Sequence, residues 1–195
     1  MKKIILLIMM FFMMLVGCQK KEENKHQGCD INEECNNEDA DMSEYELFDE
    51  NEDYVYVKSN VKEMYDKMNN HDTCIYYYGF ARCPWCRDLM PILNEAAKKT
   101  NIDHIYYVDT RENSEWKSNI DIDDYDLFVE KAGEYLELDE NNIKHLYTPF
   151  VILIKEGNII STISAPDYDA HEEKISDELK EELLNNLIEE INKLK

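Results

Sequence analysis

The chain has 195 residues, a length typical of a single domain with accessory segments. It carries 43 Asp and Glu residues against 21 Lys and Arg residues, which gives a formal net charge of −22. This acidity argues against nucleic acid as a partner, because phosphate binding requires a basic surface.

The N-terminus has the pattern of an export signal. Two lysines precede an uninterrupted apolar run over residues 4–16. A run of this length suits the hydrophobic region of a signal peptide and is short for a membrane-spanning helix of about 20 residues. The run ends in Leu-Val-Gly-Cys at residues 15–18, which resembles the lipobox of bacterial lipoproteins.

This resemblance implies that residues 1–17 are a lipoprotein signal peptide and that Cys18 is lipidated. The alternative is an uncleaved anchor at the N-terminus. In both cases the rest of the chain is anchored to the cell membrane and faces the extracytoplasmic side, where disulfides can persist.

Residues 18–53 are predicted to be the lipidated cysteine followed by an acidic, flexible tether. The segment has almost no apolar residue before Tyr45, so burial cannot offset its ordering entropy. A flexible coil of roughly 35 residues has an r.m.s. span on the order of 30 Å. Cys29 and Cys35 lie within the segment, where a local disulfide, two free thiols and a second redox pair are all compatible with their spacing.

The folded domain is predicted over residues 54–195, where strand and helix patterns alternate. In chain order the patterns predict a strand at 54–57, a helix at 60–68 capped by Ser59, a strand at 74–80, a helix at 84–99, a strand at 104–108, a helix at 123–136, strands at 149–154 and 159–163, and a helix from Ser176 almost to Lys195. This order predicts an α/β fold with a central mixed β-sheet and flanking helices.

The chemistry is expected at Cys83-Pro84-Trp85-Cys86, between an apolar strand and a helix. Cys83 would lie at the helix N-terminus, where free backbone N–H groups and the helix dipole favour a thiolate. Cys83 can then attack a substrate disulfide, and Cys86, two residues further on, can resolve the mixed disulfide. A static disulfide and half of a zinc site are the alternatives for this pair.

The residues around this pair resemble the thioredoxin superfamily near its active site. Pro91 follows Cys86 by five residues, like the helix-kinking proline of thioredoxins, and Thr148-Pro149 resembles the cis-proline of the family. The resemblance covers residues 54–195 and implies a thioredoxin-like three-layer fold. It also implies that Pro149 is cis and packs against the cysteine pair, and that Thr148 binds an extended substrate segment through its backbone.

The chain departs from the thioredoxin pattern at three places. Tyr77 occupies the position of the usual buried aspartate, so the carboxylate base expected for the second cysteine is missing there. Arg82 replaces the usual tryptophan, and a cation beside Cys83 is expected to lower the pKa of its thiol. A helical insertion, either a substrate-facing lid or an edge decoration, is expected within residues 113–142, before the cis-proline strand.

Two further residues complete the prediction for the site. Trp85, between the two cysteines, is expected to be partly exposed and to contact substrate. Cys74 opens a buried strand and is expected to be an inert core thiol. No metal and no bound cofactor are expected, since the redox-active disulfide Cys83–Cys86 is itself the working group.

Together these features predict a thiol–disulfide oxidoreductase that acts on exported proteins or peptides, together with a membrane redox partner. Whether it works as a reductase, an oxidase or an isomerase stays open, because the direction depends on the reduction potential. The chain is also similar to thioredoxin-like accessory proteins of bacteriocin export systems. The alternative function is therefore that of a non-catalytic lipoprotein that uses the fold for binding or assembly.

Overall fold

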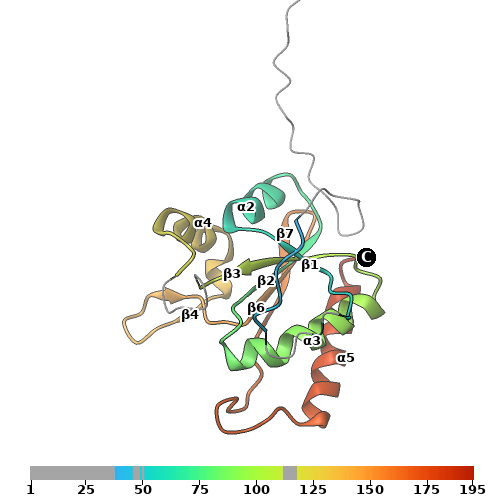
Figure 1. Cartoon of the computed structure of the whole chain (residues 1–195). Helices are drawn as coiled ribbons and strands as arrows, with labels where there is room; N and C mark the ends of the chain where they lie inside the picture. The colour runs from blue at the N-terminus through green and yellow to red at the C-terminus, as the bar shows by residue number, and fades with distance from the viewer. Residues whose placement is uncertain (1–37, 46–48, 50, 112–117) are drawn as a thin grey trace, which may run out of the picture.

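The computed structural model describes residues 38–45, 49, 51–111 and 118–195 (Figure 1). The predicted signal peptide, the lipidation site Cys18, and Cys29 and Cys35 lie outside the described residues, and so do residues 113–117 of the predicted insertion. Within the described ranges, no helix is both long enough and apolar enough to cross a membrane.

A five-stranded mixed sheet forms the middle layer of the domain. The strands lie in the order β1 (Tyr56–Lys58), β3 (Ile105–Asp109), β2 (Cys74–Gly79), β6 (Phe150–Lys155) and β7 (Asn158–Ser164). β1, β3 and β2 are parallel, whereas β6 is antiparallel to both β2 and β7. Every residue of the central strand β2 is buried, which explains why its sequence is a continuous aromatic run and not an alternating pattern.

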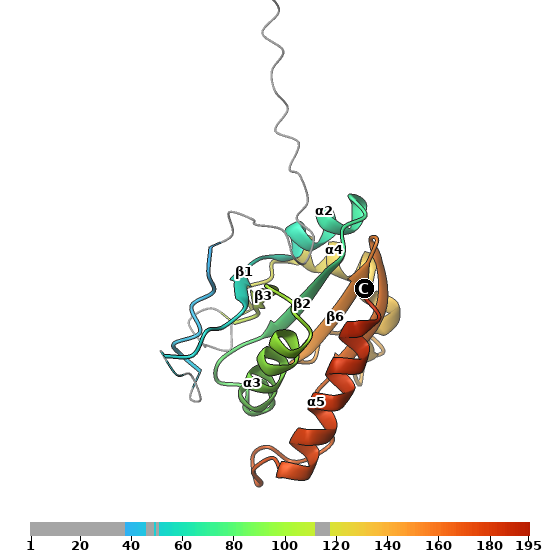
Figure 2. The ribbon, with the colours of Figure 1, turned by 90° about the vertical axis from the view of Figure 1, so that its right-hand side faces the viewer.

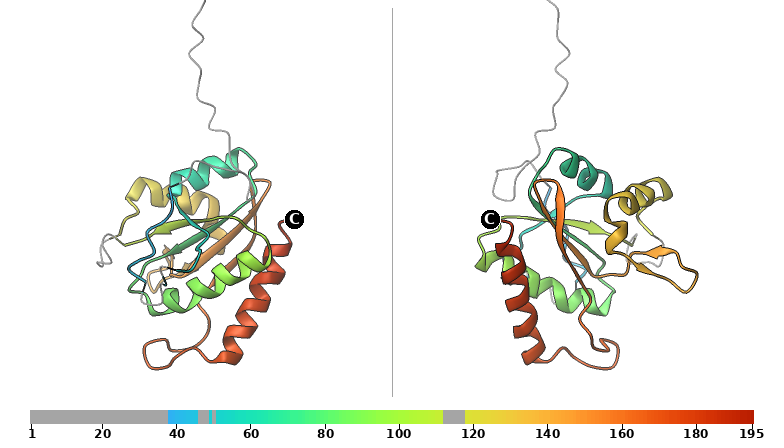
Figure 3. Two further views of the ribbon diagram at one scale, coloured as in Figure 1. Left: turned by 45° about the vertical axis from the view of Figure 1, so that its right-hand side comes forward. Right: turned by 180° about the vertical axis from the view of Figure 1, so that it is seen from behind.

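Helices cover both faces of this sheet. α2 (Val61–Asn69) and α4 (Ile122–Ala132) lie on one face, and α3 (Pro84–Lys99) packs with α5 (Asp177–Asn192) on the other (Figures 1 and 2). The two views of Figure 3 show the same three layers from other sides. The arrangement confirms the predicted α/β class and the thioredoxin-like layering.

Capping residues set the helix boundaries. α3 occupies the predicted range, with Pro84 in its first turn. α2 is capped by Asn60, whose Oδ1 accepts from the backbone N–H of Glu63 at 2.9 Å, and not by Ser59 as predicted. Ser176 caps α5 as predicted, and its hydroxyl oxygen accepts from the N–H of Leu179 at 3.1 Å.

The packed domain begins before residue 54, where the sequence predicted its start. The backbone N–H of Ala40 donates to the carbonyl oxygen of Tyr56 in β1 at 3.0 Å. Met42 and Tyr45, which the prediction placed in the tether, are buried in the core. An acidic composition hid these two apolar side chains, because their burial depends on partners far along the chain.

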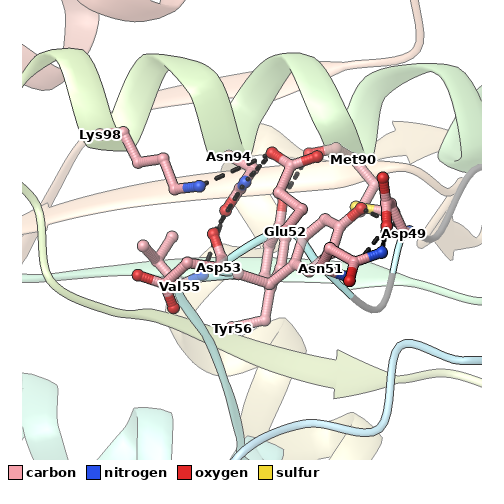
Figure 4. A network of polar contacts seen from close by, with 10 residues as sticks. Asp49, Asn51, Glu52, Asp53, Val55, Tyr56, Met90, Asn94 and Lys98 are labelled. Atoms are coloured by element: carbon pink, nitrogen blue, oxygen red, sulfur yellow. Dashed lines mark hydrogen bonds and ion pairs between the residues drawn. The ribbon is translucent and has the colours of Figure 1, made fainter.

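A polar network fastens residues 49–55 to α3 (Figure 4). Asn94 is fully buried, and its Oδ1 accepts from the backbone N–H of Val55 at 3.1 Å. Its Nδ2 donates to the Glu52 carboxylate at 3.0 Å and to the Asp53 carbonyl oxygen at 3.4 Å. The chain that enters β1 is therefore held by one buried amide side chain.

The region before β6 contains more than the predicted helix. α4 ends at Ala132, a 3₁₀ turn follows at Gly133–Tyr135, and a short hairpin pairs β4 (Glu137–Leu138) with β5 (Lys144–His145). The sequence analysis missed this hairpin, because its strands are very short and largely exposed. The hairpin leads directly into the segment that carries Pro149.

Candidate active site

Cys83 is the N-cap residue of α3, as its place between a strand and a helix predicts. Its Sγ accepts from the backbone N–H of Cys86 at 3.3 Å. Pro84 follows in the first turn, where the N–H that proline lacks would have no partner within the helix. The sulfur therefore sits at the positive end of the helix dipole, where a negative charge is favoured.

These contacts lower the pKa of the Cys83 thiol. The Cys86 thiol contributes most, the backbone N–H groups of Cys86 and Trp85 and the Thr148 hydroxyl add to it, and burial opposes them. Arg82 was predicted to have this role, but its side chain is exposed and the strongest influences come from the other groups. A thiolate at Cys83 is thus favoured by the helix end and the second cysteine.

Cys86 has the opposite environment. It is fully buried, and burial raises the pKa of its thiol well above the usual range, with the neighbouring Cys83 raising it further. A backbone hydrogen bond from Phe80 and the hydroxyl of Tyr77 lower it. Both cysteines are free thiols in this structure, so the site is described in its reduced state.

The predicted cis-proline lies beside this pair. The Thr148-Pro149 peptide bond is cis, and Pro149 is buried. The carbonyl oxygen of Thr148 lies 3.5 Å from the Sγ of Cys83. Four of the residues singled out in the sequence, Cys83, Cys86, Thr148 and Pro149, therefore meet at one place, although half of them come from a distant segment.

Trp85 is partly buried, in part by a loop that the sequence analysis did not connect with the site. Its indole N–H donates to the carbonyl oxygen of Tyr168 at 2.9 Å, and its ring meets His171 edge-on with centroids 5.0 Å apart. The Tyr168 hydroxyl donates to the Asp88 carboxylate on α3. The loop between β7 and α5 thus forms a wall beside the cysteine pair, and no periodic pattern in its sequence could have indicated this.

Cys74 lies apart from the pair. It is fully buried in β2 and is a free thiol, in the environment that the sequence predicted for it. Across the described part of the chain, no three His, Cys, Asp or Glu side chains are grouped as metal ligands would be. The chemistry that the geometry allows is that of the two thiols.

Comparisons with known proteins agree with the fold. No family model and no curated protein matches the chain. Among solved structures, oxidised thioredoxin O1 from Arabidopsis thaliana is 17% identical, with a TM-score of 0.40 over 70% of this chain and 96% of that one. Oxidised thioredoxin O2 from the same plant is 18% identical, with a TM-score of 0.35 over 58% of this chain and 85% of that one. Likeness at this level concerns the fold alone, and the site rests on the geometry described above.

Proposed function

We propose that the protein is a thiol–disulfide oxidoreductase whose reaction runs through Cys83 and Cys86. One observation carries the proposal: the sulfur of Cys83 caps a helix N-terminus, with a lowered pKa, next to a buried thiol that can resolve a mixed disulfide. A pair with only a structural role would not need one thiol stabilised as the anion that attacks disulfides.

The exchange proceeds in two balanced steps. The Cys83 thiolate attacks one sulfur of a client disulfide, the client S–S bond breaks, and the second client sulfur leaves as a thiolate. The Cys86 sulfur then loses its proton and attacks the sulfur of Cys83, which breaks the mixed disulfide and releases the other client sulfur. Two electrons pass from the cysteine pair to the client, and the reverse sequence oxidises a client dithiol.

The residues around the pair suit a client in extended conformation. The cis-proline segment at Thr148 lies against Cys83, so a client strand aligned with it would bring its sulfur to the attacking thiol. Trp85, supported by Tyr168, offers an aromatic surface on the other side of the attacking sulfur.

The place of action and the clients belong to the same proposal. The signal-like N-terminus and Cys18 support a lipid anchor on the extracytoplasmic face, and exported proteins or peptides are then the clients. A membrane redox partner would restore the pair after each turnover. No resident cofactor is required, because the dithiol supplies the electrons.

An assay of the full chain in detergent tests the function. We expect it to catalyse either the reduction of insulin disulfides by a dithiol or the oxidation of a peptide dithiol, and we expect Cys83→Ser to abolish the activity. Cys74→Ala is the matched control, since it removes a buried thiol away from the pair. Activity that persists in Cys83→Ser would overturn the assignment, and an inactive wild-type chain would favour a binding or assembly role.

A further inference from the structure

Three buried tyrosine hydroxyls gather behind Cys86, where thioredoxin-like proteins are expected to have a carboxylate. Tyr77, in β2, donates from its hydroxyl to the backbone carbonyl oxygen of Cys86 at 3.2 Å. The same hydroxyl also acts on the Cys86 thiol and lowers its pKa. A side chain at Gly79 would occupy the point between them, because its Cβ would lie 2.8 Å from the Tyr77 hydroxyl oxygen and 3.2 Å from the Cys86 sulfur.

Two further tyrosines extend this cluster. The Tyr45 hydroxyl donates to the hydroxyl oxygen of Tyr107 at 3.2 Å, and the Tyr107 hydroxyl lies 3.4 Å from the carbonyl oxygen of Gly79. The ring of Tyr107 stacks on that of Tyr77 with centroids 5.7 Å apart. Both Tyr45 and Tyr107 interact electrostatically with the Cys86 sulfur, and Tyr45 also hydrogen bonds with Tyr77.

All three hydroxyls are donors in this environment. Burial raises the pKa of Tyr45, Tyr77 and Tyr107 far above the ordinary tyrosine value, so each keeps its proton. A neutral hydroxyl stabilises a neighbouring anion by donating to it, and that effect is large where water is excluded. The anion that forms beside these hydroxyls during exchange is the Cys86 thiolate.

We propose that Tyr77, supported by Tyr45 and Tyr107, takes over the role of the missing carboxylate and stabilises the Cys86 thiolate during resolution of the mixed disulfide. Tyr77 donates to the thiolate, and the other two are positioning residues that hold its hydroxyl in place. Tyr45 comes from the segment before β1, so that segment is part of the catalytic domain.

The step is an ordinary resolution in terms of bonds and electrons. The Cys86 S–H bond breaks, its proton leaves for solvent, and the resulting thiolate is held by the Tyr77 hydroxyl. The Cys86 sulfur then bonds to the Cys83 sulfur, and the client sulfur departs with the electron pair of the broken mixed disulfide. The inference rests on the proposed function, because it concerns the second half of the same exchange.

A chromogenic aromatic disulfide separates the two halves of the reaction. Attack by Cys83 releases a first coloured thiolate, and resolution by Cys86 releases a second one. The experiment uses the reduced full chain in detergent, with the N-terminal cysteines replaced by serine so that the pair alone reacts; these are Cys18, Cys29 and Cys35. The rates of both phases are measured over a range of pH.

We expect Tyr77→Phe to slow the second phase about threefold at neutral pH and to leave the first phase unchanged. Loss of a hydrogen bond to a charged group lowers the thiolate fraction about tenfold, and the higher intrinsic nucleophilicity of a less acidic thiol restores about a factor of three. The rise of the second-phase rate with pH should move to higher pH. Tyr45→Phe and Tyr107→Phe should act in the same direction and more weakly.

Tyr56→Phe is the matched control. Tyr56 is buried in the same aromatic cluster, with its ring 5.8 Å from that of Tyr77, but its hydroxyl donates to the carbonyl oxygen of Met90 at 2.6 Å. A second phase in Tyr77→Phe equal to that in Tyr56→Phe, with the same pH profile, would overturn the inference. A missing first phase in the otherwise unchanged protein would instead overturn the proposed function, so the two failures are distinct.

Discussion

The place of the N-terminal segment in the domain can be tested at one buried side chain. Asn94 on α3 accepts from the N–H of Val55 and donates to two oxygens of the preceding residues, Glu52 and Asp53. Asn94→Ala removes all three hydrogen bonds at once. It leaves the Val55 N–H without its acceptor and opens a small cavity in a fully buried position.

The expected loss in the free energy of unfolding is about 3 kcal/mol. A buried donor left without an acceptor costs about 1–3 kcal/mol, and the two lost donations add about 1 kcal/mol. In a domain of this size, such a loss lowers Tm by roughly 6–12 °C. Urea or thermal unfolding of the reduced full chain, followed by the circular dichroism of its tyrosines, measures both quantities.

Glu52→Ala is the control on the same network. Glu52 is exposed, so removing its carboxylate should cost less than about 1 kcal/mol. The alkylation rate of Cys83 should be unchanged in both variants, since about 16 Å of helix separates it from Asn94. If Asn94→Ala is no less stable than Glu52→Ala, the network does not hold the segment, and the domain boundary drawn here is wrong.

Three further predictions concern the site. Alkylation of Cys83 by iodoacetamide should reach half its maximal rate below pH 8.5, about the value of a free cysteine; a folded-state pKa below the unfolded one also means that the thiolate adds stability above that pH, which is lost as the pH falls through the folded value. Gly79→Ala should cost about 1–3 kcal/mol of stability and slow resolution, because the new Cβ would lie 2.8 Å from the Tyr77 hydroxyl; wild-type values for both would contradict the close approach. Tyr168→Phe should loosen the loop over Trp85 and make its fluorescence easier to quench, without changing the Cys83 alkylation rate; unchanged quenching would show that the tyrosine hydroxyl does not fix the loop.

Local sequence signals were sufficient for most of the sheet and for α3. The bounds of α3 follow from Pro84 at its start and from an apolar stripe with helical spacing, both of which act within a few residues. The cis bond before Pro149 was also predicted, on the strength of the thioredoxin resemblance. These features depend on short segments, which a single sequence displays directly.

The missing parts are those that depend on distant partners. Tyr45 lies in an acidic stretch, and its burial requires the Tyr107 ring, 62 residues further along the chain. Tyr168 reaches Trp85 across 83 residues through a backbone carbonyl, a contact that no side-chain pattern records. Tyr77 was noted as a missing aspartate, but its relation to the other hydroxyls appears only once three strands and the N-terminal segment are assembled.

The two thiols of the pair are controlled by different groups, and this separates the equilibrium of the reaction from its rate. The N–H groups at the helix end stabilise the Cys83 thiolate, which persists in the reduced protein, so they favour the reduced form and make the pair more oxidising. The Cys86 thiol, in contrast, is neutral at rest, because burial raises its pKa. A hydroxyl that donates to its thiolate therefore acts mainly on the transition state of resolution. Substitutions at Tyr77 should consequently change how fast the mixed disulfide is resolved, while the reduction potential is determined mainly at Cys83.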